Sequence, residues 1–461
     1  MTFEELDLAA RAVAAKIDNV DRLAYLAENS PAKPAALFGA ALAGVPFVPM
    51  NYRLSKEQID AQLARVTPAL MIADRPVSHS GINVVGCADV MSGDTFAGEA
   101  PSVDGGVAVE LFTSGTTGEP KSAVLKHSNL MAYIFGTVEF MSAGEDEAAL
   151  LCVPPYHIAG ISALLSSIYA MRRIALLPAF EPDDCLHLAA TEKISNAFVL
   201  PTMLGRIVER LEAGVEADLS SLQAIAYGGG RMPSELIARA LELFPVTNFT
   251  NAYGLTETSS TIALLGPDDH RLAQHSDDPA VRARLGSVGR PLPTVELEIR
   301  DDEGNKLQPG QRGEIYVRGE QVSGEYRERS ALDAEGWFPT RDAGWLDQEG
   351  YLFLAGRADD VIVRGGENIS PGEIEDVLME HPAIAEAAAV GVPSTEWGEA
   401  VGIAVVYRPG ETPLDDGTLR ELVRERLRSS RVPEQIRVLD AMPYNEMGKL
   451  LRREIRNLFQ D

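Results

Sequence analysis

Strand-like and helical segments alternate through the first two thirds of this 461-residue chain. Val107–Phe112 and Ala224–Tyr227 are apolar runs that predict buried strands, and each leads into a glycine-containing loop. Ser234–Phe244 has helical periodicity, and Val246–Tyr253 returns to a strand pattern. Such alternation builds layered sheets that bind ligands at the carboxyl ends of their strands. The sequence therefore predicts an α/β fold with a large N-terminal domain of layered sheets.

The pattern changes near Val295, where Glu296–Arg300 and Glu314–Arg318 flank a turn-rich segment and predict antiparallel strands. We expect these strands to form a β-barrel-like subdomain. The end of the chain predicts a small α+β unit, because a helix begins at Pro371 behind the N-cap Ser370 and strand patterns follow it. Composition alone does not place the boundary between the two parts.

The net charge of −27, from 41 Lys and Arg against 68 Asp and Glu, argues against a general nucleic-acid binder, which would present a basic face. Three separated cysteines, Cys87, Cys152 and Cys185, make a disulfide framework unexpected and indicate a reducing compartment. The longest apolar stretch, Ala35–Met50, is interrupted by glycine and proline, so no membrane span is predicted. The acidic N-terminus does not resemble a signal peptide. These features predict a cytoplasmic protein.

The most distinctive segment runs from Thr113 to Lys121, with hydroxyl side chains and two glycines followed by Pro-Lys. Glycines let backbone N–H groups approach a phosphate, hydroxyls add donors, and Lys121 adds a positive charge. The segment is not the phosphate loop of kinases and GTPases, because Pro120 stands where that loop needs glycine. A polar turn after a strand is the alternative interpretation. The context favours phosphate binding.

This segment resembles the signature loop of the adenylate-forming superfamily, which includes acyl-CoA synthetases, peptide-synthetase adenylation domains and firefly luciferase. Further segments in the expected order extend the resemblance over nearly the whole chain. They are Pro154–Gly160, Tyr227–Gly230, Asn251–Glu257, Gly336–Asp342, Gly356–Asp360 with Gly365–Asn368, and Pro443–Arg453.

The resemblance implies an acyl-CoA synthetase that uses ATP, Mg²⁺ and coenzyme A. A carboxylate would attack the α-phosphorus of ATP, which gives an acyl-adenylate and pyrophosphate. The thiol of coenzyme A would then attack the adenylate carbonyl and release AMP. In such a reaction the protein mainly positions the reactants and neutralises charge.

The resemblance also assigns the nucleotide site. The expected phosphate contacts are Thr113, Ser114, Gly115, Thr116, Thr117 and Lys121. Glu257 resembles the Mg²⁺ carboxylate, Thr256 would bind the α-phosphate, and Tyr253 would stack on adenine. The remaining residues of the adenine and metal segments are Gly228, Gly229, Gly230, Asn251, Ala252 and Gly254. Asp342 and Arg357 are expected to bind the ribose.

Lys449 is the expected catalytic residue, because an ammonium between the carboxylate and the α-phosphate would stabilise the charge that develops during attack. Asp359 resembles a hinge about which the C-terminal domain swings between half-reactions, exchanging Lys449 for the loop at Gly365 and Gly366. The resemblance thus divides the chain into an N-terminal adenylation domain, residues 1–358, and a mobile lid, residues 359–461. A lysine in an Arg-rich tail and an ordinary turn aspartate are the alternatives.

His157 resembles a gate between the acyl pocket and the pantetheine tunnel, and a structural histidine is its alternative. The apolar residues that follow His157 predict a hydrophobic carboxylic acid as substrate, and fatty, aryl and polycyclic acids stay open. A free-standing carrier protein is the alternative acceptor to coenzyme A. The same motifs would also fit a catalytically silent nucleotide-binding relative or a luciferase-like oxidative enzyme. Dimers are common in the superfamily, so a homodimer is possible.

Three departures from the superfamily pattern stand out. The residue before Asp342 is usually glycine and is here Arg341, which could lie beside the ribose or point into solvent. Tyr444 replaces a basic residue that often follows the proline of the last motif. Relatives usually carry further segments before the stretch that resembles Thr2–Leu6, so either this is a short member, or the leading part was lost or belongs to another start site.

Overall fold

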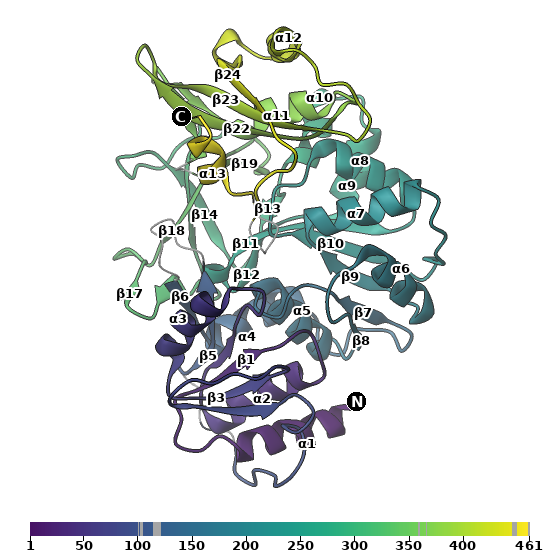
Figure 1. Ribbon diagram of the computed structural model, residues 1–461, viewed down its shortest axis with the longest axis vertical. Coiled ribbons are helices and arrows are strands. Elements are labelled where there is room, and N and C mark those ends of the chain that lie inside the picture. The colour runs from purple at the N-terminus through teal and green to yellow at the C-terminus, as the bar shows by residue number, and fades with distance from the viewer. Residues whose placement is uncertain are drawn as a thin grey trace.

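The computed structural model describes residues 1–99, 101, 105–113, 121–357, 360–365, 367–444 and 450–459. Four sheets organise these residues, and helices fill the spaces between them (Figure 1). The N-terminal helices and the C-terminal elements lie at opposite ends of the molecule, with β11 and β12 between them. Below, the body means residues 1–357 and the C-terminal unit means residues 360–459.

The first sheet has a parallel centre and an antiparallel edge. Its order is β17 (Arg329–Ser330), β16 (Glu325–Tyr326), β6 (Lys121–Lys126), β5 (Val107–Thr113), β2 (Phe47–Pro49), β1 (Arg22–Leu26), β3 (Ala69–Ala73) and β4 (Ile82–Gly86).

The second sheet is also mainly parallel, and the pairings of β12 with β11 and with β13 are antiparallel. Its order is β13 (Arg290–Pro291), β12 (Ser260–Leu265), β11 (Asn248–Leu255), β10 (Ala224–Gly228), β9 (Asn196–Val199), β7 (Ala148–Leu151) and β8 (Arg173–Leu176).

The third and fourth sheets are smaller. The strands expected for a barrel-like subdomain form an antiparallel sheet of β14 (Glu296–Arg300), β15 (Gly313–Arg318), β18 (Phe338–Leu346) and β19 (Leu352–Arg357). The C-terminal unit holds β21 (Glu367–Ile369), β20 (Ile362–Arg364), β23 (Gly398–Tyr407) and β22 (Ile384–Ser394), with β24 (Gln435–Val438) paired to β23.

The helices cover the sheet faces. They are α1 (Phe3–Ala15), α2 (Ala32–Ala43), α3 (Lys56–Val66), α4 (His127–Thr137), α5 (Ile158–Tyr169), α6 (Pro182–Thr191), α7 (Pro201–Glu212), α8 (Ser234–Leu243), α9 (Pro267–His275), α10 (Pro279–Arg282), α11 (Pro371–Met379), α12 (Asp416–Arg426) and α13 (Arg452–Asn457). Among the described residues, none of these helices has the length and apolar character needed to cross a bilayer.

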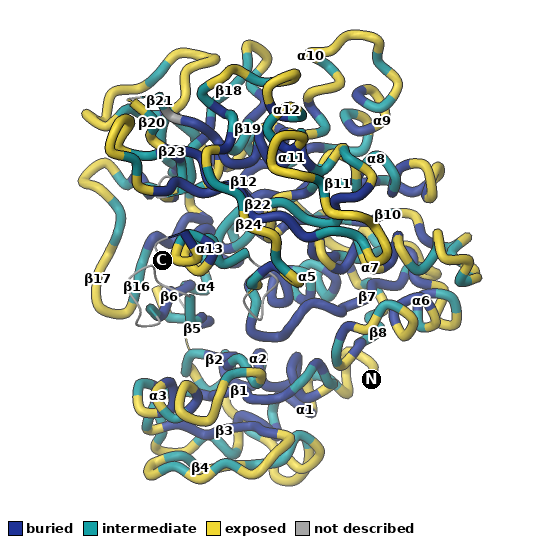
Figure 2. The backbone as a smooth tube through the Cα atoms, turned by 45° about the horizontal axis from the view of Figure 1, so that its top comes forward, coloured by how far each residue is buried: buried dark blue, intermediate teal, exposed yellow. Residues whose placement is uncertain are grey.

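Separate apolar cores lie on the two large sheets, and the buried strands appear dark in Figure 2. One core joins β1 and β5 to α2 and to α5, through side chains such as Leu23, Val109 and Ile161. The other packs α6, α7 and α8 against β9 and β10. The C-terminal unit has its own cores on both faces of its sheet. Such burial is the main favourable term in folding, at about 25 cal/mol per Å² of apolar surface.

The strand and helix predictions are confirmed, with small shifts at the ends. The predicted strand at Val107–Phe112 is β5, and the predicted helix at Ser234–Phe244 is α8. The predicted helix start at Pro371 is also confirmed, with Ser370 at the N-cap position and its backbone N–H donating to Glu373 Oε1. Local signals sufficed at these points because capping and periodicity depend on neighbours in the sequence.

Candidate active site

Three residues from distant parts of the chain form a polar cluster at the end of β11. The Tyr326 hydroxyl donates to Glu257 Oε1 over 2.7 Å, and Lys121 Nζ lies 5.8 Å from the centre of the Tyr326 ring. Glu257 is 8% exposed. Burial and the adjacent Glu257 carboxylate raise the pKa of Tyr326, so its hydroxyl stays a donor. We call Lys121, Tyr326 and Glu257 the phosphate cluster, after the phosphate and metal roles that the resemblance predicts for Lys121 and Glu257.

Local backbone geometry brings the phosphate cluster together. β11 leads into the 3₁₀ turn Thr256–Thr258, which carries Glu257, and a bulge at Tyr253 and Gly254 precedes it. A Cβ at Gly254 would meet the Ser260 carbonyl oxygen at 1.8 Å, so only glycine permits this approach. Tyr326 arrives on β16, which pairs with β6. Lys121 begins β6, opposite Thr113 at the end of β5.

A second cluster forms around Tyr253, four residues before Glu257 in the sequence. Tyr253, 8% exposed, donates its hydroxyl to Asp342 Oδ2 over 2.7 Å. Arg357 Nε lies 3.1 Å from Asp342 Oδ1, and the Arg357 guanidinium also donates to the Thr340 carbonyl. Burial, with the nearby Asp342 carboxylate, raises the pKa of Tyr253. We call Tyr253, Asp342 and Arg357 the ribose cluster, after the role that the resemblance predicts for Asp342 and Arg357.

Arg341 points away from the ribose cluster. Its side chain is 69% exposed, and its guanidinium lies 3.7 Å from Glu314 Oε1. Its backbone φ of 63° falls in the left-handed region, which favours glycine. The glycine expected here by the resemblance therefore has a conformational reason, and this chain places a solvated arginine in the same conformation.

The predicted glycines and Asn251 have structural reasons of their own. A Cβ at Gly228 would lie 2.1 Å from the Ala252 carbonyl oxygen, because β10 and β11 pair closely there. Gly229 has a φ of 77°, whereas a Cβ at Gly230 would make ordinary contact with Pro201. Asn251 is buried and donates its amide to the Ser287 carbonyl. Strand packing therefore occupies part of the space beside these glycines.

The segment Pro154–Gly160, below called the gate segment, differs from the two clusters because His157 and the neighbouring Lys33 are buried without a charged partner among the contacts described below. His157 occupies the position before the first residue of α5, and burial lowers its pKa to about 4, so the imidazole is neutral at pH 7. Its Nδ1 has no hydrogen-bond partner among the residues that the structure describes. Behind it, the fully buried Lys33 donates from Nζ to the Gly160 carbonyl at 3.1 Å and to Asn29 Oδ1 at 3.4 Å. Burial lowers the pKa of Lys33 to about 7.

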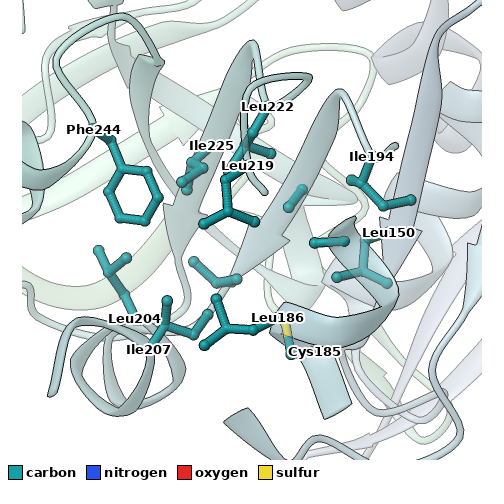
Figure 3. Close-up of a pocket in the computed structure, with 13 residues that line it drawn as sticks. Leu150, Cys185, Leu186, Ile194, Leu204, Ile207, Leu219, Leu222, Ile225 and Phe244 are labelled. Carbon is teal, nitrogen blue, oxygen red and sulfur yellow. The ribbon is translucent and has the colours of Figure 1, made fainter. Parts of the chain in front are cut away.

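Two cavities among the described residues of the body are relevant here. One of about 160 Å³ opens beside the gate segment, with apolar walls and two arginines, and is lined by Tyr52, Arg53, Cys152, Pro154, Pro178, Ala179, Phe180, Leu200, Thr202, Met203 and Arg206. The other, of about 30 Å³, has only apolar walls and Cys185, and lies among the core side chains of α6, α7 and β10 (Figure 3). None of the predicted site residues lines it. We interpret it as a packing gap, which apolar walls keep dry.

The structure gathers the described residues that the sequence predicted for the nucleotide site. Thr113, Lys121, Glu257, Tyr253, Asp342 and Arg357 lie in or next to the two clusters. Gly365 is elsewhere, in the C-terminal unit, where its N–H donates to the Trp397 carbonyl. The predictions at Ser114, Gly115, Thr116, Thr117, Asp359, Gly366 and Lys449 lie outside the described residues.

Sequence reasoning missed Tyr326 and Lys33. Tyr326 lies about two hundred residues from its strand neighbour Ala123, and no local pattern marks it. Lys33 carried a detectable signal, because it is the single charge inside the apolar helix pattern that becomes α2. A buried cation at that place is costly, which makes it a candidate for a functional or structural role.

Comparison with known proteins gives a consistent picture. Residues 1–327 match the family model described as AMP-binding enzyme, and residues 373–449 match the AMP-binding enzyme C-terminal domain. A 2-succinylbenzoate–CoA ligase from Bacillus cereus (strain Q1) is 33% identical over 448 residues, which covers 95% of this chain and 89% of the relative.

Solved structures resemble the whole chain. The o-succinylbenzoate CoA synthetase MenE from Bacillus subtilis, in complex with the acyl-adenylate intermediate OSB-AMP, has a TM-score of 0.84 and 29% identity, and covers 98% of this chain and 92% of its own. The same enzyme has been solved with ATP and a magnesium ion. ATP-bound MatB from Rhodopseudomonas palustris has a TM-score of 0.87 and 26% identity, and covers 100% of this chain and 94% of its own.

Proposed function

The chain belongs to the AMP-binding enzyme family, and on this premise we propose that it activates 2-succinylbenzoate, or an aryl acid with a second carboxylate. The class of reaction is that of the relatives: the protein is an ATP-dependent, AMP-forming acid–thiol ligase that uses coenzyme A. The finer proposal concerns which acid is taken and how the residues of this chain divide the work.

The observation that carries the proposal is the position of the two clusters at opposite ends of one short segment. Tyr253 and Glu257 are four residues apart, so their backbones are separated by at most about 14 Å. An extended nucleotide can therefore place its ribose on Asp342 and its phosphates near Glu257 and Lys121. One carboxylate suits Mg²⁺, which keeps water and substrate phosphate ligands and binds few protein carboxylates.

The chemistry then follows from charge. Lys121 would neutralise phosphate charge, while Tyr326 holds the Glu257 carboxylate in a fixed orientation for the metal. Mg²⁺ supplies Lewis-acid neutralisation of the phosphate oxygens when it is bound. Lys449 would stabilise the charge that develops at the α-phosphate as the carboxylate attacks. Asp342 would accept hydrogen bonds from the ribose hydroxyls.

The cavity beside the gate segment supports an aryl acid with a second anionic group. Its apolar side chains, among them Phe180 and Met203, suit a ring. Arg206, which also lines the cavity, already pairs with Glu181 Oε2 at 2.7 Å, so a substrate carboxylate would have to share or replace that contact. The neutral His157 adds no charge to the acyl path. Because α5 buries Ile161 and Leu164 in the core, the apolar run after His157 is explained by packing and does not by itself require a fatty acid.

We also propose the domain division at Asp359, with residues 1–358 as the adenylation domain and residues 359–461 as a lid that carries Lys449. The separate cores of the body and the C-terminal unit support two units that move as rigid bodies. Gly365 and Gly366 would face the site in the second half-reaction.

A homodimer in the cytoplasm is proposed as well. Phe135, Phe140 and Met141 are 58%, 59% and 57% exposed, and both phenylalanines contact Tyr169. Apolar patches of this kind mark protein contacts. Light scattering should give a dimer for the natural chain and a monomer for Phe140→Asp. Three free cysteines and the use of ATP and coenzyme A support the cytoplasm.

Product identification tests the proposed function. The protein is incubated with ATP, Mg²⁺ and coenzyme A plus 2-succinylbenzoate, benzoate, or a medium-chain fatty acid, and the products are identified by mass spectrometry. We expect the mono-thioester of 2-succinylbenzoate and AMP, and their loss in Lys449→Ala. AMP formation that ignores coenzyme A would favour a carrier protein as acceptor. Turnover of no acid, despite AMP binding, would favour a silent relative.

A further inference from the structure

One buried carboxylate in the C-terminal unit joins two arginines that come from different parts of the molecule. Glu375, in α11, accepts from Arg452 Nη2 at 3.0 Å and from Arg231 Nη1 at 3.4 Å. Its side chain is 7% exposed. Although burial opposes ionisation, Arg452 and Arg231 together keep the pKa of Glu375 below its usual value. The carboxylate is therefore charged and shared between the two arginines.

The two arginines differ in where they come from. Arg231 directly follows Gly228–Gly230 in the body, next to the nucleotide segment. Arg452 belongs to the C-terminal unit, as Glu375 does, and follows Lys449 by three residues in the sequence. Any rotation of the C-terminal unit would keep the Arg452–Glu375 contact and break the Arg231 contact, since only the latter crosses between the units.

Arg231 makes two more contacts across this boundary. Its guanidinium donates to the Gly372 carbonyl at 3.0 Å and to the Asp376 carboxylate. A Cβ at Gly372 would lie 2.7 Å from Arg231 Cζ, so the guanidinium packs into the space that glycine leaves. A second body arginine, Arg312, lies 3.7 Å from Glu373 on the same helix. The first turns of α11 are thus held by cations of the body.

We propose that Arg231 is a latch: it holds the C-terminal unit in the orientation described here, which serves adenylation, and must release α11 before thiol transfer. Arg231 is a positioning residue that acts through α11 and Arg452 on the segment of Lys449. This inference rests on the proposed function only for the reactions named in its test. If Arg231 acts as a latch, the relative rates of the two half-reactions depend on its contact with α11, which lies outside the nucleotide site.

The two half-reactions can be measured separately. Adenylation is followed by acid-dependent ATP–pyrophosphate exchange, and thiol transfer by thioester formation from supplied acyl-adenylate. Because a partly exposed ion contact is weak, we expect Arg231→Met to slow adenylation roughly three- to fivefold and to leave thiol transfer unchanged or faster. Gly372→Ala should act in the same direction without removing a charge. Arg239→Met, which removes an ion pair to Glu212 within the body, is the matched control.

A distance measurement tests the latch without catalysis. Spin labels on Asp302→Cys and Glu411→Cys, in a Cys87→Ser background, report the separation of the two units. We expect Arg231→Met and Gly372→Ala to populate a second distance that the control lacks. Equal losses in both half-reactions, or an unchanged distance distribution in both variants, would overturn the latch. Absence of exchange with every acid would contradict the proposed function and leave the distance test of the latch intact.

Discussion

The nucleotide part of the site and the gate part treat charge in opposite ways. In the nucleotide part, Asp342 faces Arg357 and a tyrosine hydroxyl, and Glu257 faces a tyrosine hydroxyl near Lys121. In the gate part, His157 and Lys33 are buried, and Lys33 bonds to neutral oxygens. Charge is paired in the part where we propose that a polyanion binds, whereas burial lowers the pKa values of His157 and Lys33 in the gate part.

The largest effect is expected at the phosphate cluster. Glu257→Gln keeps the shape of the side chain and removes the charge that would hold Mg²⁺, so kcat for adenylation should fall by about 10²–10³-fold. Pyrophosphate exchange at saturating ATP measures this fall. Glu242→Gln, at an exposed carboxylate of the body, is the control. If kcat stays unchanged and only KM for ATP rises, Glu257 binds the nucleotide without acting in the transition state.

The next effect concerns the suppressed charge of Lys33. Its pKa is about 7 in the folded chain and about 10.5 when exposed, so the unfolded chain binds more protons between these values. The free energy of unfolding contributed by Lys33 therefore rises with pH in this window. From pH 7 to pH 9 the natural chain should gain about 2 kcal/mol relative to Lys33→Met, measured by urea unfolding. Parallel pH profiles would mean that Lys33 keeps an ordinary pKa.

A smaller effect is expected at the ribose cluster. Asp342→Asn keeps an acceptor for Tyr253, loses the ion pair with Arg357 and weakens the acceptor for ribose. KM for ATP should therefore rise about tenfold with little change in kcat. Steady-state kinetics in ATP, with Asp302→Asn as a surface control, check this. Comparison with Glu257→Gln shows whether the two clusters differ in role. An equal loss of kcat in both variants would contradict the division into a phosphate cluster that acts in the transition state and a ribose cluster that only binds ATP.

The smallest effect is expected at Arg341, beside the ribose cluster. Arg341→Gly relieves the left-handed backbone but makes the unfolded chain more flexible, so the net gain in unfolding free energy should be about 0.5 kcal/mol. Arg341→Ala keeps the backbone cost and removes the Glu314 contact, which makes it the matched control. Thermal unfolding compares them. A change in KM for ATP in either variant would contradict the outward placement of Arg341.

The features that could be predicted from the sequence share one property, which is that they depend on neighbours along the chain. Helix caps such as Ser370 and the strand that ends at Thr113 follow from local patterns. Asp342 and Arg357 were expected from separate motifs, and strand pairing between β18 and β19 brings them into contact. The resemblance, and not the spacing, supplied their shared role.

The remaining features depend on contacts between distant elements. Tyr326 reaches Glu257 because β16 adds to the edge of the first sheet, and Arg231 reaches α11 through a contact between units. The sequence left the direction of Arg341 open, and the backbone conformation of that residue decided it. The structural contact of Asn251 was not expected either: its amide donates to the Ser287 carbonyl, and its predicted role at the nucleotide stays a prediction. Tertiary geometry, which no local pattern encodes, decides such points.

The most direct test of the central claim is ATP–pyrophosphate exchange by the natural chain, with 2-succinylbenzoate, Mg²⁺ and no coenzyme A. Exchange requires reversible cleavage between the α- and β-phosphates, which is the step that the two clusters are proposed to support. We predict exchange that depends on the acid and stops when Mg²⁺ is chelated. Release of ADP and phosphate, or exchange at the same rate without any acid, would contradict the proposed roles of the two clusters.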